Sequence, residues 1–274
     1  DRLYEIRWSD GNSLNIKGGE LRGYLDVRDG NEGLAGPNGI TSPNYRGIPY
    51  YIRKLNEFVR VFARAFNEGY IDIDGDKQFD IGEVTGSGHA GGYGYNTTVT
   101  GIRFFTMTGI GNKPISTADF LSGAPPITDP NDPTDPNYEA YHAYVYAQYE
   151  KLTAKNFAVS TDILEDFNKI STSAVPGEAG NIDILNEILK LRKNSDMFSE
   201  GAPEDYMKSL VAGLGVDSQQ AVNYESNQKV IVNQLANRRL SVSGVSIDEE
   251  LANLVRYQQA YNAAARMIRT MGEI

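Results

Sequence analysis

The chain has 274 residues, of which 40% are hydrophobic, and this is enough for a sizeable core in one large or two ordinary domains. Its formal net charge of -10 and pI near 4.8 argue against nucleic acid and anionic membrane surfaces as partners, because proteins that bind phosphate groups present basic surfaces. The absence of cysteine excludes disulfides, thiolate nucleophiles and Cys-ligated zinc.

Residues 1–70 are expected to combine a short β-hairpin with a long helix. Polar and apolar residues alternate around the turn signal SDGN, which predicts the hairpin between Leu3 and Ile16. GGELRGYLDVRDG predicts a short helix that ends at Gly30. In YYIRKLNEFVRVFARAFNEGY the apolar residues recur at three- and four-residue steps, which predicts a helix that ends near Gly69.

Residues 71–180 are rich in Gly and Pro and are expected to form a small inserted region that contains β structure. NTTVTGIRFFTMTG is the best strand candidate. GAPPITDPNDPTDPNYEAY predicts an exposed loop. The tyrosines that follow the loop fit either a helical stripe or one face of a strand.

Residues 181–274 are predicted to be helical almost throughout. NIDILNEILKLRKN predicts a helix with Asn181 as a candidate cap. The run from Pro203 to Arg239 is the longest helical signal in the chain. Its apolar positions alternate in steps of four and three, as in a coiled coil, with interruptions at Asp217 and Gln228: Leu210, Leu214, Ala221, Tyr224, Ile231 and Leu235.

A last helix is predicted from Ile247 onward. Ser246 and Glu249 form a capping box. A second seam follows in four-three steps: Ile247, Leu251, Leu254, Gln258, Tyr261, Ala265 and Ile268. The short linker SVSG between the two seams favours an antiparallel helical pair. The expected fold class is therefore mainly α with a small β-containing region (α+β), an elongated helical bundle with long C-terminal antiparallel helices.

The segment DIDGDKQFDIGE carries the clearest site signal. Its carboxylates occupy positions one, three, five, nine and twelve of a calcium-loop pattern: Asp72, Asp74, Asp76, Asp80 and Glu83. Lys77 stands where such a loop has glycine, and no helix is predicted after it. Calcium binding and a plain acidic turn both remain open, and Ca²⁺ is the only cofactor under consideration.

No pattern for catalysis is present, and we expect no enzymatic activity and no catalytic residues. The chain has no G-x-S-x-G elbow, P-loop or H-E-x-x-H pair, and His89 and His142 are its only histidines. GSGHAG matches a dinucleotide-binding fingerprint in letters alone, because no helix start follows it. The longest apolar windows, such as FVRVFARAF, are too short to span a bilayer.

Several blocks together resemble a known family. NQKVIVNQLANRRLSVSGVSIDEELANLVRYQQAYNAAARMIRTM, GGELRGYLDVRD, LNEFVRVFARAFNEGY, NFAVSTDILEDFNKIS and DYMKSLVAGLGV resemble segments of the flagellar hook-associated proteins of the hook–filament junction, in that family's order. The ending EELANLVRYQQAYNAAARMI is shared more widely among rod and hook proteins, whereas NRRLSVSGVSIDEE resembles the junction proteins in particular. The chain would correspond to the C-terminal half of such a protein. The resemblance covers most of the chain apart from residues 111–149, which look like a surface insertion relative to the family.

The resemblance implies a structural subunit of the bacterial flagellum that joins hook to filament by self-assembly of its helices. It implies hook protein, a second junction protein and further copies as partners, and an export chaperone that binds the C-terminal helices. Secretion through the flagellar type III apparatus, without a cleaved signal peptide, would place the protein outside the cell. The alternatives are another axial rod or hook protein and a calcium-dependent extracellular binding module. On either flagellar interpretation, both seams are expected to serve packing, and Leu254, Tyr261 and Ile268 should be exposed or paired with another copy.

Overall fold

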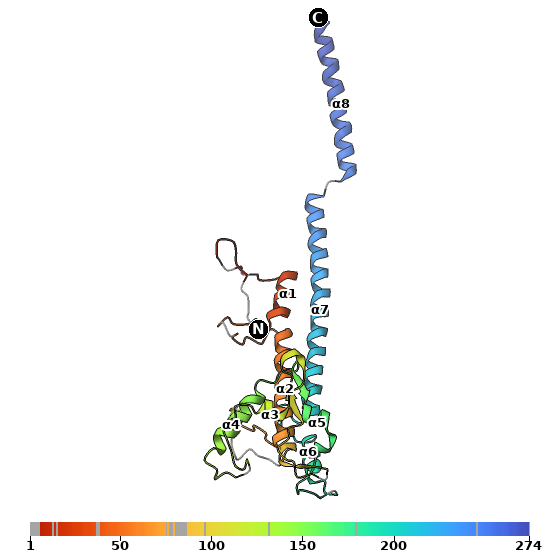
Figure 1. Cartoon of the computed structure of the whole chain (residues 1–274). Helices are drawn as coiled ribbons and strands as arrows, with labels where there is room; N and C mark the ends of the chain where they lie inside the picture. Colours follow the sequence, from red (N-terminus) through yellow and green to blue (C-terminus); the bar gives the residue numbers. More distant parts are fainter. Residues whose placement is uncertain are drawn as a thin grey trace. The chain divides into compact units, whose positions relative to one another are not determined.

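The computed structural model of the chain describes residues 6–12, 14, 16–36, 39–74, 76, 79, 87–95, 97–130, 132–178, 180–244 and 246–273. It divides into two units, Asp1–Leu214 and Gly215–Ile274, whose elements appear in Figure 1. Helices dominate, and the described strands are few and short. The expected mainly α fold with a small β-containing region is therefore confirmed.

Two helices form the N-terminal part of the first unit. α1 (Glu20–Asp29) ends where the Gly30 amide donates to the Asp26 carbonyl. α2 (Ile48–Glu68) has a proline in its first turn and ends at Gly69, which adopts the left-handed conformation with φ 70°. Both helices and both stops agree with the sequence pattern. At the predicted N-terminal hairpin the Leu14 amide donates to the Ile6 carbonyl, while residues 1–5, 13 and 15 lie outside the described residues.

The middle of the first unit is built from short elements around α2. They are η2 (His89–Gly91), β1 (Tyr93–Gly94), β2 (Phe105–Met107), η3 (Ile110–Asn112), α3 (Thr117–Phe120), α4 (Tyr138–Tyr149), β3 (Phe157–Val159), α5 (Thr161–Glu165), η4 (Phe167–Lys169) and β4 (Ser171–Ser173). β2 pairs antiparallel with β3, and β1 with β4. The strand expected within NTTVTGIRFFTMTG is therefore present as β2.

The tyrosine-rich segment is helical. Along α4 the side chains of Tyr138, Tyr141, Val145 and Tyr149 are buried, at helical steps of three and four. The alternative strand face is thereby excluded. Because the rings of this stripe pack inward, they are part of the core.

Three helices complete the chain: α6 (Asp183–Leu191), α7 (Pro203–Ser243) and α8 (Ile247–Gly272). Asn181 lies two residues before the first residue of α6, and its Oδ1 accepts the Asp183 amide at 3.0 Å. The capping residue of α8 is Ser246, whose Oγ accepts the Glu249 amide at 3.4 Å. The predicted cap of α8 is confirmed, whereas the N-cap position of α6 is Ile182, which makes no side-chain capping bond, because Asn181 lies one residue further upstream.

α2 contributes to both hydrophobic clusters of the first unit. One cluster joins it to α3 and α4: Val59, Ala63, Phe120, Tyr141, Val145, Tyr149 and Leu152. The other joins it to α6 and the first turn of α7: Ala65, Ile71, Leu191, Met197, Phe198 and Tyr206. In Figure 1, α2 accordingly runs through the middle of the first unit.

A buried polar group fixes the C-terminal end of α2. The Arg103 guanidinium makes two hydrogen bonds to the Glu68 carboxylate, of 2.8 and 3.0 Å, and the Tyr149 hydroxyl donates to the same carboxylate at 2.6 Å. Burial raises the pKa of Glu68, but the charge and hydrogen bonds of Arg103 outweigh it and hold that pKa below its usual value. Beside it, the Asn67 side chain accepts the Phe104 and Phe105 amides.

His89 is buried between the rings of Phe66 and Phe104. Its Nε2 accepts the Ser171 amide at 2.9 Å, so its Nδ1 carries the proton and donates to the Ile102 carbonyl at 2.8 Å. Burial lowers the pKa of the imidazole, against the opposing influences of the Ile102 bond and of the Glu68 charge. The neutral ring thus ties β4 to the segment before β2.

Replacing Arg103 with Met tests the buried ion pair. Glu68 would keep its buried charge without a counter-ion, so we expect a loss of about 3–5 kcal/mol in the free energy of unfolding, measured by urea denaturation. The matched control is Lys190→Met, which removes an exposed ion pair with Glu187 and should change that free energy by less than ~0.5 kcal/mol. Equal effects of the two substitutions would contradict a special role for Arg103.

The His89 geometry predicts a loss of stability on mild acidification. The imidazole has a lower pKa folded than unfolded, so the unfolded chain binds the proton first once the pH falls below about 6.5. We expect the free energy of unfolding to fall as the pH drops from about 7.5 to 5.5. His89→Gln should remove most of this pH dependence in urea titrations. Retention of the full dependence in His89→Gln would contradict the assignment.

Candidate functional site

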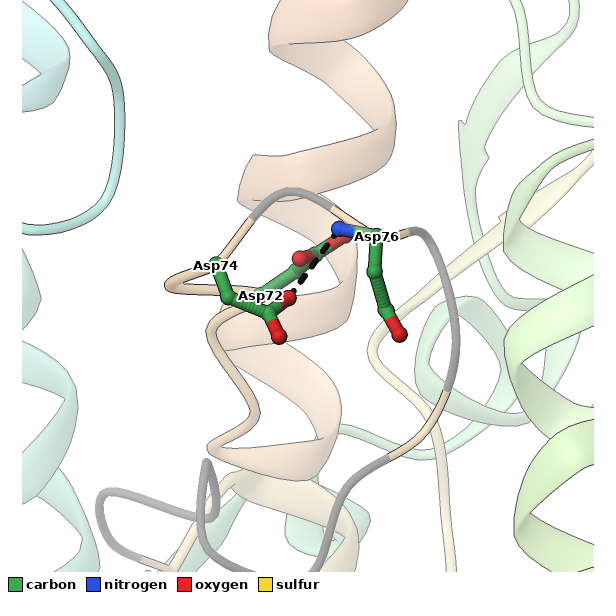
Figure 2. A group of neighbouring side chains, drawn as sticks. All are labelled: Asp72, Asp74 and Asp76. Carbon is green, nitrogen blue, oxygen red and sulfur yellow. Dashed lines mark hydrogen bonds between the residues drawn. The ribbon is translucent and has the colours of Figure 1, made fainter.

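Three of the predicted calcium ligands lie together in the turn that follows α2. One carboxylate oxygen from each of Asp72, Asp74 and Asp76 lies within 4.8 Å of the others, and Figure 2 shows the three side chains around the turn. The Asp76 amide donates to the Asp74 Oδ1 at 3.0 Å, which is the self-bonding typical of an acidic turn. Asp80 and Glu83, with Lys77 between the two groups, lie outside the described residues.

Asp72 differs from its two neighbours because its side chain is only 8% exposed and lies against the Tyr146 hydroxyl and the Arg64 guanidinium. Its Oδ2 accepts the Tyr146 hydroxyl at 2.8 Å and lies 3.9 Å from the Arg64 guanidinium. That guanidinium in turn lies over the rings of Tyr146 and Tyr70, 4.2 and 5.0 Å from their centroids. The pKa of the Tyr146 hydroxyl is raised mainly by burial, and the hydrogen bond to Asp72 and the charge of Asp72 raise it further. The charge of Asp72 is thus already compensated within the fold.

Neither histidine occupies a metal-binding arrangement in the described chain. His89 uses both ring nitrogens in hydrogen bonds to the backbone. His142 stacks on Phe79, with ring centroids 4.5 Å apart, and its Nε2 lies 2.9 Å from the Pro130 carbonyl. After Gly88 the chain forms only the single 3-10 turn η2, and a dinucleotide fingerprint needs a full helix there.

The seam of α8 is exposed along its whole length. The exposed fractions are 54% for Leu251, 60% for Leu254, 76% for Tyr261 and 72% for Ile268, which confirms the exposure expected of the last three. A shallow groove runs along the first half of this face, between Ile247 and Gln258. The capped, continuous helix therefore presents an apolar face with nothing from the described chain to cover it.

The seam of α7 is also largely exposed. Leu210 is half-buried, whereas Leu214, Tyr224, Ile231 and Leu235 are exposed. A packed hairpin of the two seams would bury both of them, and neither is buried in the described residues. The four-three periodicity identifies the apolar face of each helix and does not specify which surface covers it.

The sequence pattern underestimated the apolar surface of α8. Val255, Tyr257 and Met271 are also exposed, and they flank the seam and widen the apolar face beyond a narrow coiled-coil stripe. Their signal was visible as apolar letters between the seam positions. On α1, Leu21, Tyr24 and Val27 likewise form an exposed stripe at three-residue steps, which the short helix signal did not single out.

No helix among the described residues combines the length and apolar character required to cross a membrane.

Comparison with known proteins relates the chain to the flagellum. Residues 236–274 match the family described as "Flagellar basal body rod FlgEFG protein C-terminal". A flagellar hook-associated protein 1 from Bacillus subtilis (strain 168) is 40% identical over 70 residues, which cover 26% of this chain and 14% of that protein. The protein of the same name from Escherichia coli (strain K12) is 34% identical over 120 residues, or 42% of this chain and 22% of that protein. The protein of the same name from Salmonella typhimurium is 34% identical over 95 residues, which cover 34% of this chain and 17% of that protein.

The matched segments thus span less than a quarter of the length of these curated relatives. No solved structure matches the chain. Over these segments the chain is homologous to flagellar hook-associated protein 1, and the family resemblance predicted from its motifs is confirmed.

Proposed function

We propose that this chain is part of a structural subunit of the bacterial flagellum, which joins hook to filament by self-assembly of its helices. The observation that carries the proposal is the exposed apolar face of α8, which lies within the segment that matches the rod-protein family. Burial of such a face against a partner helix stabilises a complex by roughly 25 cal/mol per Å². Relatives named as hook-associated proteins favour the junction over other axial positions.

The partners that this role requires are hook protein, a second junction protein and neighbouring copies of the same subunit. A protein that assembles outside the cell must first be exported, and the proposal includes passage through the flagellar type III apparatus. Exposed helices with wide apolar faces, such as α7 and α8, aggregate readily when unpaired. A cytoplasmic chaperone bound to these helices would prevent that before export. The proposed subunit has no enzymatic role.

Replacing Leu251 or Ile268 with Asp tests the assembly role. A charge in the middle of an apolar contact must be desolvated, so we expect incorporation into flagella to fall at least about tenfold, a change that a penalty of only ~1.4 kcal/mol already produces. The measurement is an immunoblot of sheared flagella from a strain in which the full gene product carries the substitution.

The matched control is Gln259→Asp, which adds the same charge outside the seam of the same helix and should leave incorporation unchanged. Circular dichroism and urea denaturation should show the first unit intact in all three variants. Normal incorporation of both seam variants would remove the packing role of α8 from the proposal.

A calcium-dependent binding module is the second candidate function, favoured by one observation. The three carboxylates of Asp72, Asp74 and Asp76 converge within 4.8 Å, and carboxylate oxygens are the ligands that Ca²⁺ prefers. Because Asp72 already bonds Tyr146 and approaches Arg64, binding would be weak, in the range of about 10⁻⁴–10⁻³ M found for extracellular modules.

Calorimetric titration with calcium tests this second candidate. Wild type should release or absorb heat and gain thermal stability, and Asp74→Ala and Glu83→Ala should each abolish both effects. Glu165→Ala, which removes an exposed carboxylate from α5, is the control and should bind as wild type does. Absence of heat and of stabilisation in wild type would identify the segment as a plain acidic turn.

A further inference from the structure

A groove of about 730 Å³ lies on the first unit. Its walls are the first half of α2, the segment between α1 and α2, and the turn between α4 and β3. The volume falls within the ~300–1,000 Å³ of ordinary ligand pockets, which leaves room for a few residues of a peptide. Ser42 lines the groove, is only 5% exposed, and its Oγ makes no hydrogen bond among the described residues. An occupant whose polar group reaches this buried hydroxyl would satisfy it.

The lining of the groove is positively charged, although the whole chain has a net charge of -10. Its cations are Arg53, Arg60 and Lys155. Asp29 adds a carboxylate, which Arg28 already pairs with at 2.6 Å. Lys155 is exposed and forms no ion pair within the part of the chain that the structure describes. The groove is therefore suited to an occupant that brings carboxylates.

The two arginines are held in place by their own contacts. Arg53 lies 3.3 Å from the Glu32 carboxylate, and Arg60 lies 3.0 Å from that of Glu150. Arg46 approaches the same Glu32 at 3.2 Å, so this carboxylate is shared between two cations. The fixed arginines add to the positive potential of the groove.

The chain also carries a segment with the complementary character. Residues 114–150 contain six carboxylates and no lysine or arginine. In the loop before α4, here called the Asp-Pro loop (residues 126–137), Asp129, Asp132 and Asp135 each precede a proline. Proline has no amide hydrogen that docking would have to remove from water, and its ring can cover apolar surface. The loop thus combines negative charge with a low cost of desolvation.

The Asp-Pro loop has a defined conformation before any contact. Asp132 accepts the Thr134 amide at 2.9 Å, and Asp135 accepts the Asn137 amide at 2.8 Å. These side-chain bonds to the amide two residues later are Asx turns. A loop that is already ordered loses less conformational entropy when it binds.

The loop and the groove lie at opposite ends of α4. The Asn137 side chain donates to the Pro126 carbonyl at 2.8 Å, and the Nε2 of His142 lies 2.9 Å from the Pro130 carbonyl, so the loop is attached to the start of the helix. Lys155 of the groove follows the end of the helix, which has 12 residues, or about 18 Å of length. The loop therefore cannot occupy the groove of its own chain.

We propose that the Asp-Pro loop of one copy docks in this groove of a second copy. The loop carboxylates face Lys155 and the two arginines, and the exposed rings of Pro130 and Pro133 cover the apolar side chains of Ile52 and Leu55. Because loop and groove are different surfaces, the contact is head-to-tail and can continue from copy to copy. It uses the first unit alone and goes beyond the assembly role proposed for the seam of α8.

Disulfide trapping tests the contact in the intact chain, which has no cysteine of its own. Chains with Pro133→Cys and chains with Ala154→Cys, both at exposed positions, are mixed under mild oxidation. In the control mixture Ser195→Cys, exposed outside the groove, replaces Ala154→Cys. We expect at least about tenfold more mixed disulfide than in the control, the ratio that ~1.4 kcal/mol of binding produces. Equal yields at every protein concentration overturn the proposal.

Charge reversal tests the complementarity within the same assay. Lys155→Glu on the Ala154→Cys chain should lower the yield about tenfold, because carboxylates then face carboxylates. Asp132→Lys on the Pro133→Cys chain should restore the yield by forming the opposite pair. Lys193→Glu reverses an exposed charge outside the groove and should change nothing. An unchanged yield with Lys155→Glu, or no recovery in the combination, contradicts the docking.

A seam variant separates this contact from the assembly role. With Leu251→Asp in both chains, the mixed disulfide should still form, because α8 takes no part in the docking. Loss of the disulfide in that background would mean that α8 brings the copies together, and it overturns the proposed docking. Normal incorporation of Leu251→Asp into flagella, with the disulfide retained, overturns the role of the seam alone.

Discussion

The ion pair between Glu68 and Arg103 is the interaction on which the first unit depends. It lies where α2 ends, and it holds the segment before β2 and the end of α4 against that helix through Tyr149. Asn67, one residue earlier, continues the attachment through the backbone of Phe104 and Phe105. Short strands and single helical turns contribute little stability alone. Buried charge-assisted hydrogen bonds give this collection of short elements one defined arrangement.

The second unit is stabilised by local interactions within each helix and not by buried contacts between distant residues. Its helices satisfy their backbone internally and are supported by a cap at Ser246 and by local ion pairs such as Glu225–Lys229. Its apolar side chains remain in water, although most helical stability in proteins comes from packing of an apolar face. α8 alone therefore leaves its apolar face without the burial that normally stabilises a helix, and in the proposed assembly partner helices would supply it. This contrast explains why the first unit carries the buried core and the C-terminal helices carry the proposed assembly surface.

Local signals predicted the helices well. α2, α6, α7 and α8 follow from apolar spacing, and the end of α2 and the start of α8 follow from Gly69 and Ser246, because caps and periodicity act within a few residues. The pairing of Glu68 with Arg103 joins positions 35 residues apart, and no local pattern encodes it. Equally, the seam spacing defined the apolar face of α8 but contained no information on whether a helix of the same chain or of another covers it.

For the acidic segment, the spacing of the aspartates in the sequence placed Asp72, Asp74 and Asp76 together. It did not show that Tyr146 and Arg64, which lie on helices, already contact Asp72.

The position of α2 in both hydrophobic clusters has a consequence for cooperativity. Ala63 belongs to one cluster and Ala65 to the other, so a single turn of α2 contributes side chains to both clusters. Phe58 packs against both of them. Fraying of that turn would open the two clusters together, since neither can keep its packing density when α2 moves. The first unit should accordingly lose its tertiary structure in one transition, with amide protons near Tyr149 and near Tyr206 exchanging through the same opening event.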